Sequence, residues 1–154
     1  MYCQDCTLAQ HRQHPLHQLK EWSGSFFKRC TLKDCRLHIQ LGHHIGEKCC
    51  RPCPIVREEF IILHSNGLHV VSLDFCGYKT AETPSSQLLR MRFFPASSDK
   101  PRTATTFNLL EAFHVLSLES KVSAYEFYNA LSCHSDNTGL APPKVCSMCF
   151  FTLR

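Results

Sequence analysis

The sequence predicts an α+β fold: a small zinc-stapled N-terminal segment, then a β-hairpin or short antiparallel sheet, then two C-terminal helices. Residues 1–54 hold 7 of the 11 cysteines and 6 of the 10 histidines. Residues 60–75 are rich in the branched and aromatic side chains that favour strands. From about Thr106 the apolar residues take helical spacing. We therefore expect one cysteine-cluster domain with a Cys/His-rich segment at 1–54 and a small α+β region at 55–154.

Composition narrows the class of protein. The chain has 154 residues, with 44% hydrophobic and 19% charged residues, which favours a folded domain over a disordered one. Its longest aliphatic or aromatic runs are about four residues, too short for a membrane-spanning helix. The start, MYCQDC, lacks the apolar stretch of a signal peptide. An odd number of cysteines beside many histidines favours metal binding in a reducing, intracellular compartment over a disulfide framework.

The formal net charge of +4 is concentrated in the Cys/His-rich half. Residues 1–60 hold 9 basic and 6 acidic side chains, whereas residues 61–154 hold 8 and 7. This balance permits contact with phosphates but does not require it.

The middle of the chain predicts strands. Residues 60–63 and 68–75 have strand composition, and Ser65-Asn66-Gly67 between them predicts a hairpin turn, because Asn and Gly tolerate positive φ. Residues 88–94 alternate partly and predict a third strand. Residues 79–86 and 95–105 are rich in Ser, Thr and Pro and predict loops.

The C-terminal third predicts two helices. Leu109, Phe113 and Leu116 share one helix face at i, i+4 and i+7. Ser123-Ala-Tyr-Glu126 fits a capping box that begins a second helix. The expected buried side of that helix comprises Val122, Tyr125, Tyr128 and Leu131. Residues 136–139 and 142–143 are expected to end regular structure.

The first metal signal lies at the N-terminus. Cys3 and Cys6 form a CxxC pair, His11 and His14 follow as HxxH, and His17 lies three residues beyond. Two thiolates and nearby imidazoles are ligands that Zn²⁺ takes in structural sites. The spacing also resembles the second half of a B-box zinc finger, in which the Cys pair and the His pair serve different metals. Two interpretations therefore remain: a single zinc site, or one half of a cross-brace that binds two zinc ions.

A second constellation lies further along the chain. His43, Cys49, Cys53 and Cys76 would meet if the hairpin folds back on the loop that holds the first three. Cys30, Cys35 and Cys133 are interpreted as small buried apolar residues. Cys146 and Cys149 form another CxxC pair, with few neighbouring partners.

The chain resembles the cysteine-cluster domain associated with KDZ (Kyakuja–Dileera–Zisupton) transposases of fungal type. The resemblance runs along the whole chain, through stretches that include CQDC, HRQHPLH, LKEWSGSFF, LGH, NGLH, DFCG, QLLR, RFFPA and TATTF. The family pattern extends beyond both ends of the chain, so we expect a truncated or fragmentary copy.

The resemblance implies a non-catalytic accessory domain that binds structural Zn²⁺ beside a transposase. It implies a nuclear location and DNA, transposase subunits or other proteins as partners, with no small-molecule substrate and no membrane. Carried over by position, the implied ligands are Cys3, Cys6, His11, His17, His43, Cys49 and Cys76. The chain departs from the family at Tyr78, where a second Cys often follows FCG. Cys50 or Cys53 would have to replace it.

Three classes of function and one non-functional interpretation follow. A nucleic-acid module needs converging cations, for which the candidates are Lys28, Arg29, Lys33, Arg36, Lys48 and Arg51. A B-box-like protein-interaction module needs an exposed apolar patch, such as Trp22, Phe26 and Phe27, and a non-functional transposon remnant needs neither. An enzyme is disfavoured, because Asp74 has no partner acids and a Cys76/His69 nucleophile pair has no third group to orient it.

Overall fold

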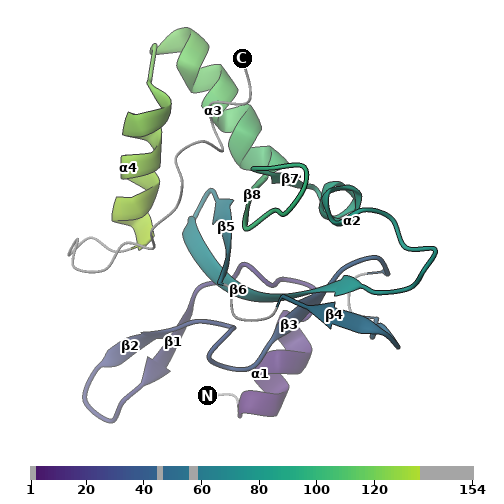
Figure 1. The fold of residues 1–154 in the computed structure, drawn as a ribbon. Helices are drawn as coiled ribbons and strands as arrows, with labels where there is room; N and C mark the ends of the chain where they lie inside the picture. The colour runs from purple at the N-terminus through teal and green to yellow at the C-terminus, as the bar shows by residue number, and fades with distance from the viewer. Residues whose placement is uncertain (1–2, 45–46, 56–58, 136–154) are drawn as a thin grey trace.

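The computed structural model describes residues 3–44, 47–55 and 59–135 (Figure 1). In chain order the elements are α1 (Gln4–His11), β1 (Leu19–Trp22), β2 (Phe27–Cys30), β3 (His38–Gln40), β4 (Pro52–Pro54), β5 (Phe60–His64), β6 (Gly67–Cys76), α2 (Pro84–Arg90), β7 (Phe93–Pro95), β8 (Thr103–Thr106), α3 (Phe107–Glu119) and α4 (Ala124–Ser135). The α+β class is confirmed.

The predicted hairpin is the centre of the fold. β5 and β6 pair antiparallel from Phe60↔Val71 to His64↔Gly67. Gly67 has a φ of +130°, a backbone conformation that residues with a side chain rarely adopt, so the turn needs glycine there. The two expected strands and the turn between them are therefore confirmed.

The hairpin belongs to a larger, mixed sheet than the sequence predicted. Its strand order is β3-β6-β5-β8-β7, and β4 also pairs with β6. β3 and β8 run parallel to their neighbours β6 and β5, which requires crossovers that local sequence patterns do not reveal. Asp74 of β6 is matched both with Gln40 of β3 and with Pro54 of β4, so β3 and β4 lie on opposite edges of β6.

Two hydrophobic cores cover the two faces of the sheet. The run Phe60–Leu63 is buried throughout, and its side chains alternate between the cores. Phe60 and Ile62 pack with Leu88 of α2, whereas Ile61 and Leu63 pack with the helices α3 and α4. A strand that is covered on both faces has a continuous run of apolar residues, and Phe60–Leu63 is such a run.

The region after β6 differs from the sequence expectation. The strand expected at 88–94 is wrong, because Pro84–Arg90 forms α2 and only Phe93–Pro95 is extended. Thr83 caps this helix by accepting from the backbone N–H of Ser86, and proline follows at the first helical position. The loop expected at 95–105 gives way to β8 at Thr103, which is buried between β5 and β7.

Both C-terminal helices are confirmed, with corrections to their buried faces. Ser123 Oγ accepts from the backbone N–H of Glu126 at 3.2 Å, and the Glu126 carboxylate accepts from the Ser123 N–H at 2.9 Å, which is the expected capping box. Leu109, Leu131 and Tyr128 pack in the core as expected. Tyr125 is 65% exposed, so its expected burial is wrong, and Leu116, on the same helix face as Leu109, is 40% exposed. The expected ends of structure at 136–139 and 142–143 lie outside the described residues.

The N-terminal segment contacts the central hairpin at the β5–β6 turn. Asn66 donates from Nδ2 to the Leu16 carbonyl at 2.9 Å, and the Gln18 amide donates to the Asn66 carbonyl. These bonds place the chain just before β1 beside the β5–β6 turn. Among the described residues, no helix is long and apolar enough to cross a membrane.

Candidate metal centre

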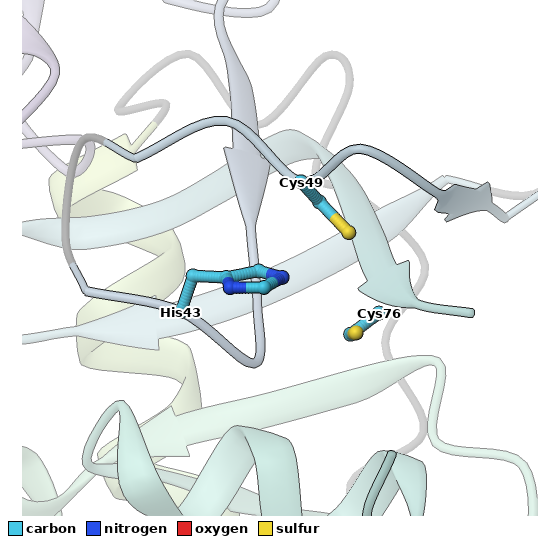
Figure 2. A group of neighbouring side chains, drawn as sticks. All are labelled: His43, Cys49 and Cys76. Atoms are coloured by element: carbon cyan, nitrogen blue, oxygen red, sulfur yellow. The ribbon is translucent and has the colours of Figure 1, made fainter. Parts of the chain in front are cut away.

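Three predicted ligands from distant parts of the chain meet at the end of β6. His43 follows β3, Cys49 precedes β4, and Cys76 is the last residue of β6. Their ligand atoms all lie within 4.8 Å of one another. Figure 2 shows the imidazole and the two thiols turned toward a shared space. The fold-back of the hairpin on the 43–53 loop, which the sequence analysis required, is present because β3 and β4 both pair with β6.

The imidazole of His43 carries the clearest sign of a ligand. Its Nε2 atom is buried and has no hydrogen-bond partner in the described part of the chain. A buried polar atom without a partner costs folding free energy, so such atoms call for an explanation. A cation between this nitrogen and the two thiolates would supply the partner.

The donor set fits a tetrahedral soft-metal site. Zn²⁺ binds sulfur at about 2.3 Å and nitrogen at about 2.0 Å, which places tetrahedral ligand atoms about 3.5–3.8 Å apart. The observed spacing of the three atoms requires only a small inward movement to reach this geometry. Cysteine and histidine are the usual ligands of structural zinc sites, which take four of them, so one further ligand would complete this set.

Two glutamines hold the cysteine backbones in place. Gln40 Oε1 accepts from the Cys49 N–H at 2.6 Å. Gln87 Oε1 accepts from the Cys76 N–H at 2.8 Å, and its Nε2 donates to the Cys76 and Glu82 carbonyls. Gln87 is only 2% exposed, so these bonds are shielded from water. Such support orients ligands and tunes metal affinity.

Sequence reasoning missed these two glutamines. A signal for one of them was present: Thr83-Pro84 is a helix start, and it would have placed Gln87 on a helix beside Leu88 rather than on a strand. No local signal shows that Gln87 faces Cys76, because the contact spans eleven residues and depends on how α2 packs.

Gly42 permits the close approach of the loop to β6. Its φ is +84°, and a Cβ built there would lie 2.6 Å from the Cβ of Cys76 and 3.3 Å from Oε1 of Gln87. Glycine is thus required both by the backbone conformation and by the space. It sets the distance between His43 and Cys76.

Cys53, the fourth predicted member of this constellation, is not part of the group. Cys53 is matched with Phe75 and Pro52 with Cys76, and side chains alternate between faces along a strand. The register therefore turns Cys53 to the face opposite Cys76. Cys50, the other alternative, is exposed and also lies outside the group. A side-chain hydrogen bond with Cys50 is the main cause that raises the pKa of Tyr78.

The N-terminal ligands form two separate groups. The Cys6 N–H donates to Cys3 Sγ at 3.5 Å, and this bond lowers the pKa of the Cys3 thiol. His14 and His17 stack with ring centroids 4.9 Å apart, and His11 meets His17 edge-on at 5.3 Å. Both cysteines lie at the start of α1 and the histidines at or beyond its end. Within the described residues, the cysteines and histidines do not come together as one group.

The remaining described cysteines do not join a metal group. Cys30 and Cys35 are half-buried, with sulfur atoms 3.6 Å apart, and burial raises the pKa of Cys30 to about 11, so this thiol stays neutral. Cys133 is exposed, so its interpretation as a buried residue was wrong. Cys146 and Cys149 lie outside the described residues.

The two enzymatic alternatives find no support in the geometry. Asp74 is buried and accepts from Nδ1 of exposed His38 at 3.2 Å, as a structural carboxylate does. His69 and Cys76 are seven residues apart on one extended strand, about 23 Å, and lie on opposite faces. Burial lowers the pKa of His69 to about 4, and this imidazole meets Asn66 Oδ1 at 2.6 Å.

The fold and the site define a small α+β cysteine-cluster domain with a candidate metal centre. The family model described as CxC2 like cysteine cluster associated with KDZ transposases matches residues 32–139, more than two thirds of the chain. The chain therefore belongs to this family, as its sequence resemblance implied. No curated protein and no solved structure matches the chain. The matched range contains His43, Cys49 and Cys76 but not the N-terminal Cys and His residues.

Gly42→Ala tests whether the site depends on this close approach. We expect the variant to lose about 2–4 kcal/mol of stability, from left-handed strain and from the clash with Cys76. Gly24→Ala is the matched control, because Gly24 has a similar φ of +98° but a Cβ there meets nothing within 4 Å. Urea unfolding measures both. Equal losses would show that the contact with Cys76 is unimportant.

Proposed function

We propose that the chain is a non-catalytic, zinc-binding accessory domain of a KDZ-type transposase that acts in contact with DNA or the transposase assembly. The single observation that carries the zinc part is the convergence of His43, Cys49 and Cys76 around a buried, unpartnered Nε2 atom. Family membership supports the accessory role. A nuclear location and transposase subunits as partners follow from that association.

The proposed ion would fasten the end of the sheet. Its three ligands come from the loops at β3 and β4 and from the end of β6. β3 and β4 have three residues each, too few for stable pairing without further support. A structural Zn²⁺ would cross-link them to β6, and the free energy of metal binding would become folding free energy.

His43→Ala tests the zinc proposal. We expect protein purified without chelator to lose one equivalent of zinc relative to the unchanged chain, measured by elemental analysis. His44→Ala is the control, because the neighbouring His44 is exposed and lies outside the group. Equal zinc contents in the two variants would contradict the proposed role of His43.

Cys50 is proposed as the fourth ligand in place of the family cysteine that Tyr78 replaces. Cys50 lies outside the group but directly follows Cys49, so it is the nearer candidate along the chain, whereas the register turns Cys53 away. In the cobalt-substituted protein, Cys50→Ser should weaken the sulfur-to-cobalt charge-transfer band, because one thiolate ligand is lost. Cys53→Ser should leave the band unchanged. The reverse result would assign Cys53 to the site.

A hollow between α1 and β3 supports contact with DNA phosphates. It has a cavity volume of about 200 Å³ and is lined by Arg12, Arg36 and Lys48, with Glu47 as an acidic neighbour. The expected convergence of cations is thus present for two of the six candidates from the sequence analysis, Arg36 and Lys48. By contrast, Lys33 is paired with Glu59 at 3.1 Å.

Arg36→Gln tests the DNA proposal. We expect weaker binding to duplex DNA of any sequence, with the slope of log K against log salt reduced by about 1. Lys33→Gln removes the same charge from a paired side chain and should change the slope less. Fluorescence anisotropy at several salt concentrations measures both. Equal effects would indicate diffuse charge rather than a phosphate site at the hollow.

A further inference from the structure

The β1–β2 hairpin is the second, separate sheet of the molecule. It projects from the six-stranded sheet, and its two strands pair only with each other (Figure 1). The turn is closed by the Ser23 N–H, which donates to the Phe26 carbonyl at 3.0 Å, and by Ser23 Oγ, which accepts from the Phe26 N–H at 3.2 Å. The family match begins at residue 32, after this hairpin.

The hairpin register sorts its side chains into two unlike faces. Trp22 lies opposite Phe27 and Lys20 opposite Arg29, and alternation puts these four residues on one face. We call this set the aromatic-cationic face. The other face carries the half-buried pair Leu19–Cys30 and the opposite charges Glu21 and Lys28.

The aromatic-cationic face is costly as a purely structural surface. The rings of Trp22 and Phe27 meet with centroids 5.0 Å apart, yet the two residues remain 44% and 65% exposed. Lys20 and Arg29 are like charges directly opposite each other, an arrangement that destabilises a strand pair. The one acid of the two strands, Glu21, lies on the other face and cannot offset them there.

These features match one kind of partner. Exposed aromatic rings stack on unpaired bases, and flanking cations bind the phosphates, which is how proteins hold single-stranded nucleic acid. In a duplex the faces of the bases are stacked on one another, so they are not accessible to the rings of Trp22 and Phe27. Arg29 donates to the His134 carbonyl at 2.9 Å, which fastens the hairpin to the end of α4.

We propose that the aromatic-cationic face, Lys20, Trp22, Phe27 and Arg29, binds single-stranded nucleic acid by stacking bases on the two rings and pairing phosphates with the two cations. This inference rests on the proposed DNA-contacting function and names the form of nucleic acid that the hairpin takes. It does not depend on the zinc ion, because the hairpin contributes no member of the metal group.

Trp22 supplies a direct reporter, because it is the only tryptophan in the chain. A single-stranded oligonucleotide of about 12 nucleotides, within the usual site size, should quench its fluorescence, whereas the same sequence as a duplex should not. Phe27→Ala should weaken single-strand affinity about 5- to 150-fold, the effect of losing one stacked base. The whole 154-residue chain, loaded with zinc, is used throughout.

Lysine variants separate the two faces. Lys20→Gln should weaken single-strand binding and lower its salt dependence, whereas Lys28→Gln removes the same charge from the opposite face and should do so less. Zinc content, measured in every variant, should stay at the value of the unchanged chain, so that failure here is distinct from failure of the metal site.

Three results would overturn the inference. The first is equal affinity for single strand and duplex, with the single-strand affinity of Phe27→Ala unchanged. The second is an equal loss of affinity in the two lysine variants. The third is no binding of nucleic acid, together with a change of Trp22 fluorescence when the catalytic region of a KDZ transposase is added. The last result would assign the face to a protein partner. In each case, unchanged zinc content leaves the proposed metal site standing.

Discussion

The pairing of β6 with three different strands is the constraint on which the rest of the structure depends. Its first half pairs with β5, and its second half is held between β3 and β4. Because β3 runs parallel to β6 and β4 runs antiparallel to it, the loop that follows β3 and the loop that precedes β4 reach the same end of β6. That end is Cys76, and the loops carry His43 and Cys49. The candidate metal centre is thus a consequence of strand pairing.

The same constraint explains why glycine and glutamine surround the cysteines. Bringing a loop against the end of a strand needs a residue without a Cβ, which is Gly42. It also leaves backbone groups at the strand end without sheet partners, and a buried amide such as Gln87 bonds both the N–H and the carbonyl of Cys76. The candidate metal centre and these supports lie next to the hydrophobic core that contains Leu88 of α2.

Local patterns in the sequence predicted the parts of the fold that depend on interactions between residues close together in the chain. The hairpin at Ser65–Gly67 and the capping box at Ser123 depend on neighbours within a few residues, and both are present. β8 and α2 were missed: the parallel pairing of Thr103–Thr106 with β5 is long-range, and the Thr83-Pro84 helix start was outweighed by partial alternation at 88–94. Residue types and spacing singled out His43, Cys49 and Cys76, but register alone separates Cys53 from them.

We propose that one metal ion joins His43, Cys49 and Cys76. Zinc K-edge X-ray absorption of a Cys3→Ser, Cys6→Ser variant, which removes the N-terminal thiols, tests it most directly. We expect the zinc ion to be surrounded by nitrogen at about 2.0 Å and by at least two sulfur atoms at about 2.3 Å. A shell of oxygen and nitrogen alone, or no bound zinc, would contradict it.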